Sequence, residues 1–177
     1  MAKKITIVGM FAALTAVGGL LPKLFIGPVP FTFQFVFCCL AGLILGSKLG
    51  ALSQFIYVAL GLIGLPIFAK GGGPQYVFEP TFGYLAGFIL SAFVIGLIIE
   101  KLKPTKIENF LVASFAGMLL LYVPGVSYMY LILNFYKVGA SMSFGLAFFQ
   151  GFAIFLPSGI VFCILASIIA KKVRRFV

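Results

Sequence analysis

The stretch FAKGGGPQYVFEPTFGY, residues 68–84, interrupts a chain that otherwise consists of long apolar runs rich in Leu, Ile, Phe, Ala and Gly. It holds three consecutive glycines, two prolines, two tyrosines, Lys70 and Glu79, and Glu79 is one of three acidic residues in the chain. Backbone that is not helical is tolerated in a membrane only where protein or water covers it. The stretch therefore predicts a connection at the membrane surface between two helices that cross the lipid.

The composition of the whole chain indicates that its solvent is lipid. Of its 177 residues, 63% are hydrophobic and 9% are charged, and the mean hydropathy is +1.23. Soluble domains carry about 25% charged residues, and a domain of this size exposes too much surface to hide so many apolar side chains. The sequence therefore predicts an integral membrane protein. Its net charge of +10 suits the membrane-topology rule and anionic lipids rather than nucleic acid.

Six apolar segments are candidates for membrane-spanning helices, which need roughly 20 mostly apolar residues each. They cover residues 5–21, 32–46, 49–68, 82–99, 110–133 and 144–170. Pro157 is expected to kink or break the last one. With six spans, ten of the 13 Lys and Arg residues fall on one side of the membrane, and Lys23, Lys70 and Lys137 fall on the other.

The positive-inside rule then places both termini in the cytoplasm. We therefore expect an all-α membrane protein, a bundle of six transmembrane helices that forms a single domain over residues 1–177. A signal peptide is the less favoured interpretation of the first segment, because no clear cleavage site precedes a polar start.

Several kinds of chemistry are disfavoured by residues that the sequence lacks. It contains no His and no Asp, which removes His-based triads, His-ligated metals and most carboxylate dyads. We therefore expect neither an enzyme nor a metal or cofactor site. The cysteines Cys38, Cys39 and Cys163 lie in apolar runs and form no zinc or disulfide pattern. The sequence has no Walker A motif and no acid at mid-membrane, so transport would need an energy source from a partner.

The side opposite the termini combines residues that suit a small amphiphile with an anionic group. Aromatic residues of the 68–84 stretch offer walls, Gln34 offers an amide, and lysines offer charges for a carboxylate. Gly71, Gly72 and Gly73 permit unusual backbone angles and close approach to a ligand; a plain flexible connector is the alternative. A buried amide such as that of Gln34 needs partners, either on a neighbouring helix or on a ligand.

Four stretches of the sequence resemble one known family. They are VPFTFQF (29–35), LAGLILGSKLGALSQFIYVALGLIGLPIFA (40–69), GGG with PTFGYLAGF (71–73 and 80–88) and, more weakly, YVPGVSY (122–128). The chain resembles the BioY family, the biotin-uptake S components of energy-coupling factor (ECF) transporters. The resemblance implies six helices with both termini inside and a vitamin site on the outer side, capped by loops. It also implies docking on a transmembrane coupling protein through Ala12 and Ala16, with two cytosolic ATPases driving the cycle.

One departure from the family pattern concerns the sixth helix. Family members often carry Phe-Leu-Pro-Gly-Asp followed by a Lys, and both polar residues help to hold biotin. This chain reads FLPSGIVF at 155–162, with Gly159 and Phe162 at those places. If the ligand is biotin, other groups must replace them, with Glu79 accepting from the ureido N–H groups. The lysines available for the carboxylate are Lys23, Lys70 and Lys137.

The sequence as a whole predicts a membrane-embedded S component that captures biotin from the outer side. The expected substrate-binding residues are Gln34, Lys70, Gly71, Gly72, Gly73, Glu79, Thr81 and Tyr84, followed by Tyr76, Phe82, Asn134 and Ser158. The alternatives are an S component for another small carboxylic acid such as lipoate, a carrier that works without a coupling module, and a membrane assembly protein without a ligand.

Overall fold

A computed structural model describes residues 2–21, 24–26, 28–103, 106–137 and 139–174. Most of these residues are helical, as the sequence predicts. The helices are α1 (Ala2–Leu20), α2 (Gln34–Leu45), α3 (Ser47–Ile63), α4 (Phe82–Leu102), α5 (Ile107–Leu131), α6 (Phe144–Gly151) and α7 (Leu156–Val173), with the short helical turns η1 (Pro74–Phe78), η2 (Ile132–Tyr136) and η3 (Ala153–Phe155). Each predicted apolar segment therefore contains helix, and the last one contains two.

The last apolar segment breaks next to Pro157, as expected. Phe152 leaves the helical region with φ −130° and ψ −60°, which ends α6. Pro157 then occupies the first turn of α7, where the missing N–H costs no helical hydrogen bond. The break divides the segment into a short α6 and a longer α7.

The sequence does not predict the short hairpin that precedes α2. Strands β1 (Leu24–Ile26) and β2 (Val29–Phe31) pair antiparallel, with Phe25 opposite Pro30. Two prolines in this segment suggest an irregular loop, because proline lacks the N–H that a strand donates. In a two-stranded hairpin, however, one edge of each strand is unpaired, and a proline is tolerated there.

Four described stretches are long and apolar enough to cross a membrane. They are Ala2–Leu20, Phe82–Leu102, Ile107–Tyr136 and Phe144–Val173. Helices α2 and α3 are apolar but shorter, with 12 and 17 residues. The structure therefore has the character of a membrane protein, while a count of six spans depends on how α2 and α3 sit in the lipid.

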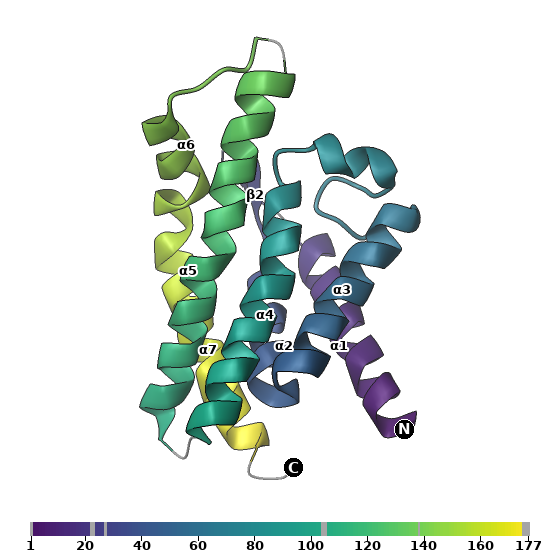
Figure 1. The fold of residues 1–177 in the computed structure, drawn as a ribbon, viewed down its shortest axis with the longest axis vertical. Helices are drawn as coiled ribbons and strands as arrows, with labels where there is room; N and C mark the ends of the chain where they lie inside the picture. Colours follow the sequence, from purple (N-terminus) through teal and green to yellow (C-terminus); the bar gives the residue numbers. More distant parts are fainter. Residues whose placement is uncertain (1, 22–23, 27, 104–105, 138, 175–177) are drawn as a thin grey trace.

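Figure 1 shows the helices as one bundle with two distinct ends. The start of α1, the turn between α2 and α3, and the end of α7 lie at one end, which we call the termini end. Residues 64–81 and the connection after η2 lie at the opposite end, which we call the loop end. At the loop end, the structure describes Lys70 and Lys137, while Lys23 lies outside the described residues. Arg175, which follows α7, also lies outside the described residues.

Glycines allow α4 to lie close to its neighbours. A Cβ atom at Gly87 would lie 2.6 Å from the carbonyl oxygen of Leu121 on α5. A Cβ at Gly96 would lie 2.2 Å from the backbone of Gly46, at the turn between α2 and α3. Small residues let helix backbones approach closely in lipid. These contacts fix α4 between α2, α3 and α5, and thereby fix the side chains that α4 presents at the loop end.

At the termini end, α4 also holds the start of α3. The Glu100 carboxylate accepts hydrogen bonds from the Ser47 backbone N–H at 2.7 Å and from the Ser47 hydroxyl at 2.8 Å. A carboxylate at a helix N-terminus satisfies a free N–H group and complements the helix dipole. Glu100 therefore has a structural role at the end opposite the candidate site.

Candidate functional site

A cavity lies among β2, α2, α4, α5 and α7, in the half of the bundle nearer the loop end. Its empty space, counted together with the open solvent at its mouth, is about 650 Å³. The walls are mainly aromatic and aliphatic, and include Phe31, Phe35, Phe88, Leu121, Phe155 and Phe162. Among the described residues that line the cavity, none carries a charge. The cavity therefore suits an uncharged and largely apolar group.

Gln34 lines this cavity, as the sequence predicts, and is 3% exposed. Its amide nitrogen donates to the Tyr57 hydroxyl, and its amide oxygen accepts from the Thr32 hydroxyl at 3.0 Å. Tyr57 in turn donates to the carbonyl oxygen of Ile67 at 3.3 Å. The amide thus has partners on neighbouring segments, which fix its orientation at the cavity wall.

Tyr76 and Thr81 line the cavity from the 68–84 stretch, also as predicted. The Thr81 hydroxyl donates to the Tyr76 hydroxyl at 2.9 Å, which leaves the Tyr76 proton available to another acceptor. The Tyr76 ring packs against Phe68, with ring centroids 4.6 Å apart. Burial raises the pKa of the Tyr76 phenol above its ordinary value, so this hydroxyl stays neutral near pH 7.

Tyr84 and Ser158 complete the predicted residues that line the cavity. The Tyr84 hydroxyl donates to the carbonyl oxygen of Gly151 at 2.8 Å, and the Ser158 hydroxyl donates to that of Phe155 at 2.8 Å. Both carbonyl groups lie at the break between α6 and α7. These two hydroxyls therefore satisfy backbone carbonyl groups at the break.

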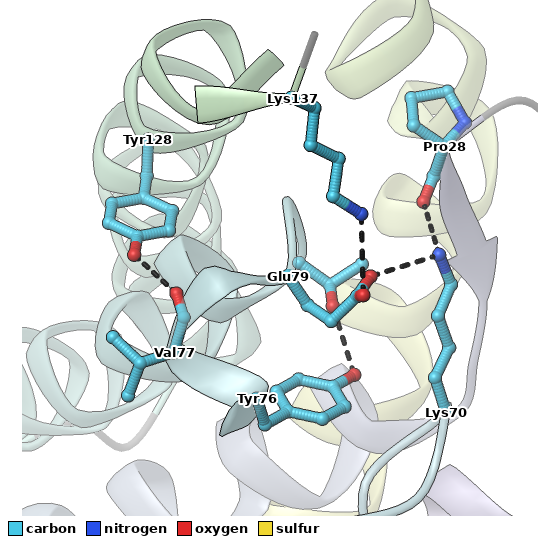
Figure 2. A network of polar contacts seen from close by, with 8 residues as sticks. Pro28, Lys70, Tyr76, Val77, Glu79, Tyr128 and Lys137 are labelled. Carbon is cyan, nitrogen blue, oxygen red and sulfur yellow. Dashed lines mark hydrogen bonds and ion pairs between the residues drawn. The ribbon is translucent and has the colours of Figure 1, made fainter. Parts of the chain in front are cut away.

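Lys70 and Glu79 lie together at the loop end with Lys137 (Figure 2). The Glu79 carboxylate is 3.5 Å from the Lys70 ammonium and 3.3 Å from the Lys137 ammonium. Lys70 also donates to the carbonyl oxygen of Pro28 at 3.3 Å. We call Lys70, Glu79 and Lys137 the ion triad. It joins the connections before α2, before α4 and after η2, outside the set of described residues that line the cavity.

The three glycines shape the loop rather than the cavity wall. Gly71 and Gly73 have φ of +115° and +104°, which favours glycine. A Cβ at Gly72 would lie 2.0 Å from the carbonyl oxygen of Leu65. Gly73 donates its N–H to the carbonyl oxygen of Gly61 at 2.7 Å. The glycines therefore fold the loop against the end of α3, outside the described lining of the cavity.

Other predicted residues lie away from the described cavity lining. The Phe82 ring contacts Tyr128 with centroids 5.6 Å apart, and the Asn134 side chain donates to the Tyr130 carbonyl and accepts from the Met142 N–H. Ala12 is buried, on the side of α1 that meets α2 and α3, and Ala16 is half-buried.

The list of expected binding residues omits wall residues on α5, and on α7 it omits Gly159 and Phe162, the two positions that the family pattern had singled out. Tyr122 and Leu121 line the cavity from α5, and Gly159 and Phe162 line it from α7. The Phe162 ring lies 5.7 Å from that of Phe31, so an aromatic group occupies the place where the family pattern suggests a lysine. A tyrosine within the apolar α5 is a signal in the sequence, but its direction is visible only in the folded structure.

The fold and the cavity together define a class: a helical membrane protein with a small-molecule pocket in the half of the bundle nearer the loop end. The sequence matches the family model described as "BioY family" over residues 1–177, and the chain belongs to that family.

Named relatives agree with this assignment. The chain is 41% identical to a probable biotin transporter BioY of Lysinibacillus sphaericus, covering 97% of this chain and 86% of the relative. It is 39% identical to the biotin transporter BioY of Thermotoga maritima, covering 94% of this chain and 93% of the relative. A crystal structure of the S component for biotin from an ECF-type ABC transporter matches with a TM-score of 0.83 and 27% identity, covering 98% of this chain and 92% of that one.

Proposed function

We propose that this protein is the biotin-binding S component of an ECF-type transporter in the cell membrane. It captures biotin from the outer side and delivers it with a coupling protein and two ATPases. The observation that carries the proposal is the apolar cavity, in a fold that matches a solved biotin S component with a TM-score of 0.83. The relatives named above are transporters rather than enzymes.

The chemistry of biotin fits the distribution of polar groups. Biotin has an uncharged ureido head, an apolar ring and chain, and a carboxylate at its end. A carboxylate is costly to bury among uncharged walls, so we expect it to point out of the cavity toward the ion triad, where Lys70 follows the lining residue Ala69 and supplies positive charge together with Lys137. The body of the ligand lies between aromatic walls, and polar groups of Gln34, Tyr76 and Thr81 face it.

For Glu79 we propose a positioning role instead of direct contact with the ureido group. Its carboxylate contacts both lysines of the ion triad and is about one-third exposed. Holding the two lysines over the mouth keeps their charges where the ligand carboxylate arrives. Gly71, Gly72 and Gly73 support this arrangement by folding the loop that carries Lys70.

We propose that the chain crosses the membrane six times with both termini in the cytoplasm. At about 1.5 Å per residue, the 12 residues of α2 span less than the hydrocarbon core of about 30 Å. The irregular segments before α2 and after α3 would complete these two crossings, enclosed by protein. The excess of Lys and Arg at the termini end supports a cytoplasmic location of that end.

Docking on the coupling protein is proposed for α1. This helix packs on α2 and α3 and leaves its other side to the surroundings. Ala16 is half-buried at the edge of that side, whereas Ala12 faces inward. Of the two alanines, Ala16 is therefore better placed to contact a partner, and Ala12 supports the packing of α1.

The direct test is equilibrium binding of labelled biotin to the purified protein, with lipoate as competitor. Saturable biotin binding that excess lipoate does not displace is expected. Absence of biotin binding, together with thermal stabilisation by lipoate, would overturn the biotin assignment while keeping a carboxylic acid S component. Stabilisation by neither ligand would favour an assembly protein, and biotin uptake in cells that lack the coupling module would favour a stand-alone carrier.

A further inference from the structure

The wall that α5 contributes to the cavity includes Tyr122, whose ring is held on two sides. Its centroid lies 4.9 Å from that of Phe152 at an interplanar angle of 80°, and 6.2 Å from that of Tyr84 at 85°. Both are edge-to-face contacts, which are favourable for aromatic pairs. The position of the Tyr122 hydroxyl is therefore set by packing of the ring.

The other polar side chains that line the cavity already have partners. Thr32 bonds Gln34, Gln34 bonds Tyr57, and Thr81 bonds Tyr76. The hydroxyls of Tyr84 and Ser158 donate to backbone carbonyl groups. The Tyr122 hydroxyl, by contrast, makes no hydrogen bond within the described part of the chain, and Tyr122 is a half-buried residue of the cavity lining. This hydroxyl is therefore free to form a hydrogen bond with a ligand, and such a bond contributes to binding.

Helix α7 passes close to the Tyr122 hydroxyl at Gly159. A Cβ atom at Gly159 would lie 3.6 Å from the Tyr122 hydroxyl oxygen and 2.7 Å from the Met118 sulfur. Gly159 has no such atom, so the backbone of α7 approaches closely without covering the hydroxyl. Both Gly159 and Tyr122 line the cavity. A bound molecule in the cavity can therefore reach this hydroxyl.

We propose that Tyr122 is a specificity-determining residue whose hydroxyl hydrogen-bonds an uncharged polar atom in the head of the ligand. With biotin, and thus resting on the proposed function, that atom is the ureido carbonyl oxygen. The uncharged walls make a neutral acceptor the matching group, because a charged one would lack a counter-ion there. A ligand without the acceptor would leave the hydroxyl unpaired and bind less tightly.

The test compares Tyr122→Phe with Tyr130→Phe, using biotin and 2-thiobiotin as probes. Tyr122→Phe keeps the ring and removes only the hydroxyl, while Tyr130 lies on the same helix, outside the described cavity lining. The first variant should bind biotin about five- to tenfold more weakly, the loss typical of one neutral hydrogen bond, and the second should bind as wild type does. Sulfur accepts hydrogen bonds weakly, so wild type should disfavour 2-thiobiotin, and Tyr122→Phe should lose most of that preference.

The two proposals fail in different ways. If wild type binds no biotin, the proposed function is wrong, and the proposed role of Tyr122 is wrong as well. If wild type binds biotin but Tyr122→Phe keeps the full preference over 2-thiobiotin, only the role of Tyr122 is overturned.

A second pair of variants covers the case in which Tyr122→Phe does not fold. Gly159→Ser places a competing hydroxyl beside Tyr122, and Gly159→Ala adds the same Cβ without it; the flexible end of Met118 can yield to either. The serine variant should lose more preference for biotin over 2-thiobiotin than the alanine variant. Equal preferences in these two variants would overturn the proposal.

Discussion

Glu79 is the residue on which the arrangement of the ion triad depends most directly, since it contacts both of its lysines. Its side chain is 31% exposed, so these ion pairs add little to folding stability. Under the proposed function we expect their effect on ligand retention instead, because they join separate connections at the loop end (Figure 2).

We predict that Glu79→Gln weakens biotin binding about tenfold, which corresponds to about 1.4 kcal/mol, mainly through faster dissociation. Stopped-flow binding and release measure both rates. Glu108→Gln is the matched control, because Glu108 is an exposed acid at the start of α5, at the termini end. Tighter binding by Glu79→Gln would show that Glu79 competes with the ligand carboxylate for the lysines.

Gly71 and Gly72 require glycine for two different physical reasons. Gly71 has a positive φ with open space around it, so Gly71→Ala should cost about 1–2 kcal/mol of unfolding free energy through backbone strain. Gly72→Ala would bring a Cβ to 2.0 Å from a backbone oxygen and should cost about 3 kcal/mol. Thermal unfolding in detergent shows which of the two variants is less stable. The reverse order would contradict the packing of this loop on the end of α3.

The residues of the cavity were predictable to different degrees. Gln34, Thr81 and Tyr84 are polar groups next to turn-forming residues, so the sequence alone places them at a membrane surface. Tyr122 and Phe162 lie in helices that are apolar on every face, where periodicity cannot distinguish a side chain facing lipid from one facing a cavity. The place of Tyr122 at the wall follows from tertiary packing alone, whereas the family pattern had already singled out the position of Phe162.

At the scale of elements, the close contact between α4 and α5 sets the distance between two walls of the cavity. A Cβ at Gly87 would lie 2.6 Å from the Leu121 carbonyl oxygen. Gly87→Ala should therefore separate the helices, cost about 1–3 kcal/mol of stability and reduce biotin affinity. Gly145→Ala in α6 is the control, since Gly145 has nothing within 4 Å, and a gain of up to about 1 kcal/mol is expected there. Equal effects of the two variants would contradict the role of the α4–α5 contact.

Helix positions followed well from the apolar runs, because hydropathy decides which residues enter lipid. The hairpin of β1 and β2 did not follow, since Pro28 and Pro30 give the same local signal as an irregular loop. Pro157 predicts that the last segment is interrupted and roughly where, but it does not predict how the backbone at the interruption is satisfied. The hydrogen bond from Tyr84 that satisfies this break is a tertiary contact, whereas the one from Ser158 is local.

At the scale of the whole molecule, the proposed topology places the loop end outside the cell. We predict that a thiol reagent that cannot cross membranes labels Ser141→Cys in intact cells, and labels Lys101→Cys only after the membrane is opened. Both positions are exposed and lie at opposite ends of the bundle. The native Cys38, Cys39 and Cys163 are 0% exposed, so wild type supplies an unlabelled background. Labelling of Lys101→Cys in intact cells would contradict the orientation.

If the ion triad acts on the ligand as proposed, we expect release of the ligand to be sensitive to dissolved ions. Its charges are held at 3.3–3.5 Å and stay partly in contact with water. The Debye length falls from about 30 Å at 0.01 M ionic strength to about 8 Å at 0.15 M. A residence time measured in dilute buffer will therefore exceed the residence time in a saline growth medium, and washing with concentrated salt is a gentle way to empty the purified protein.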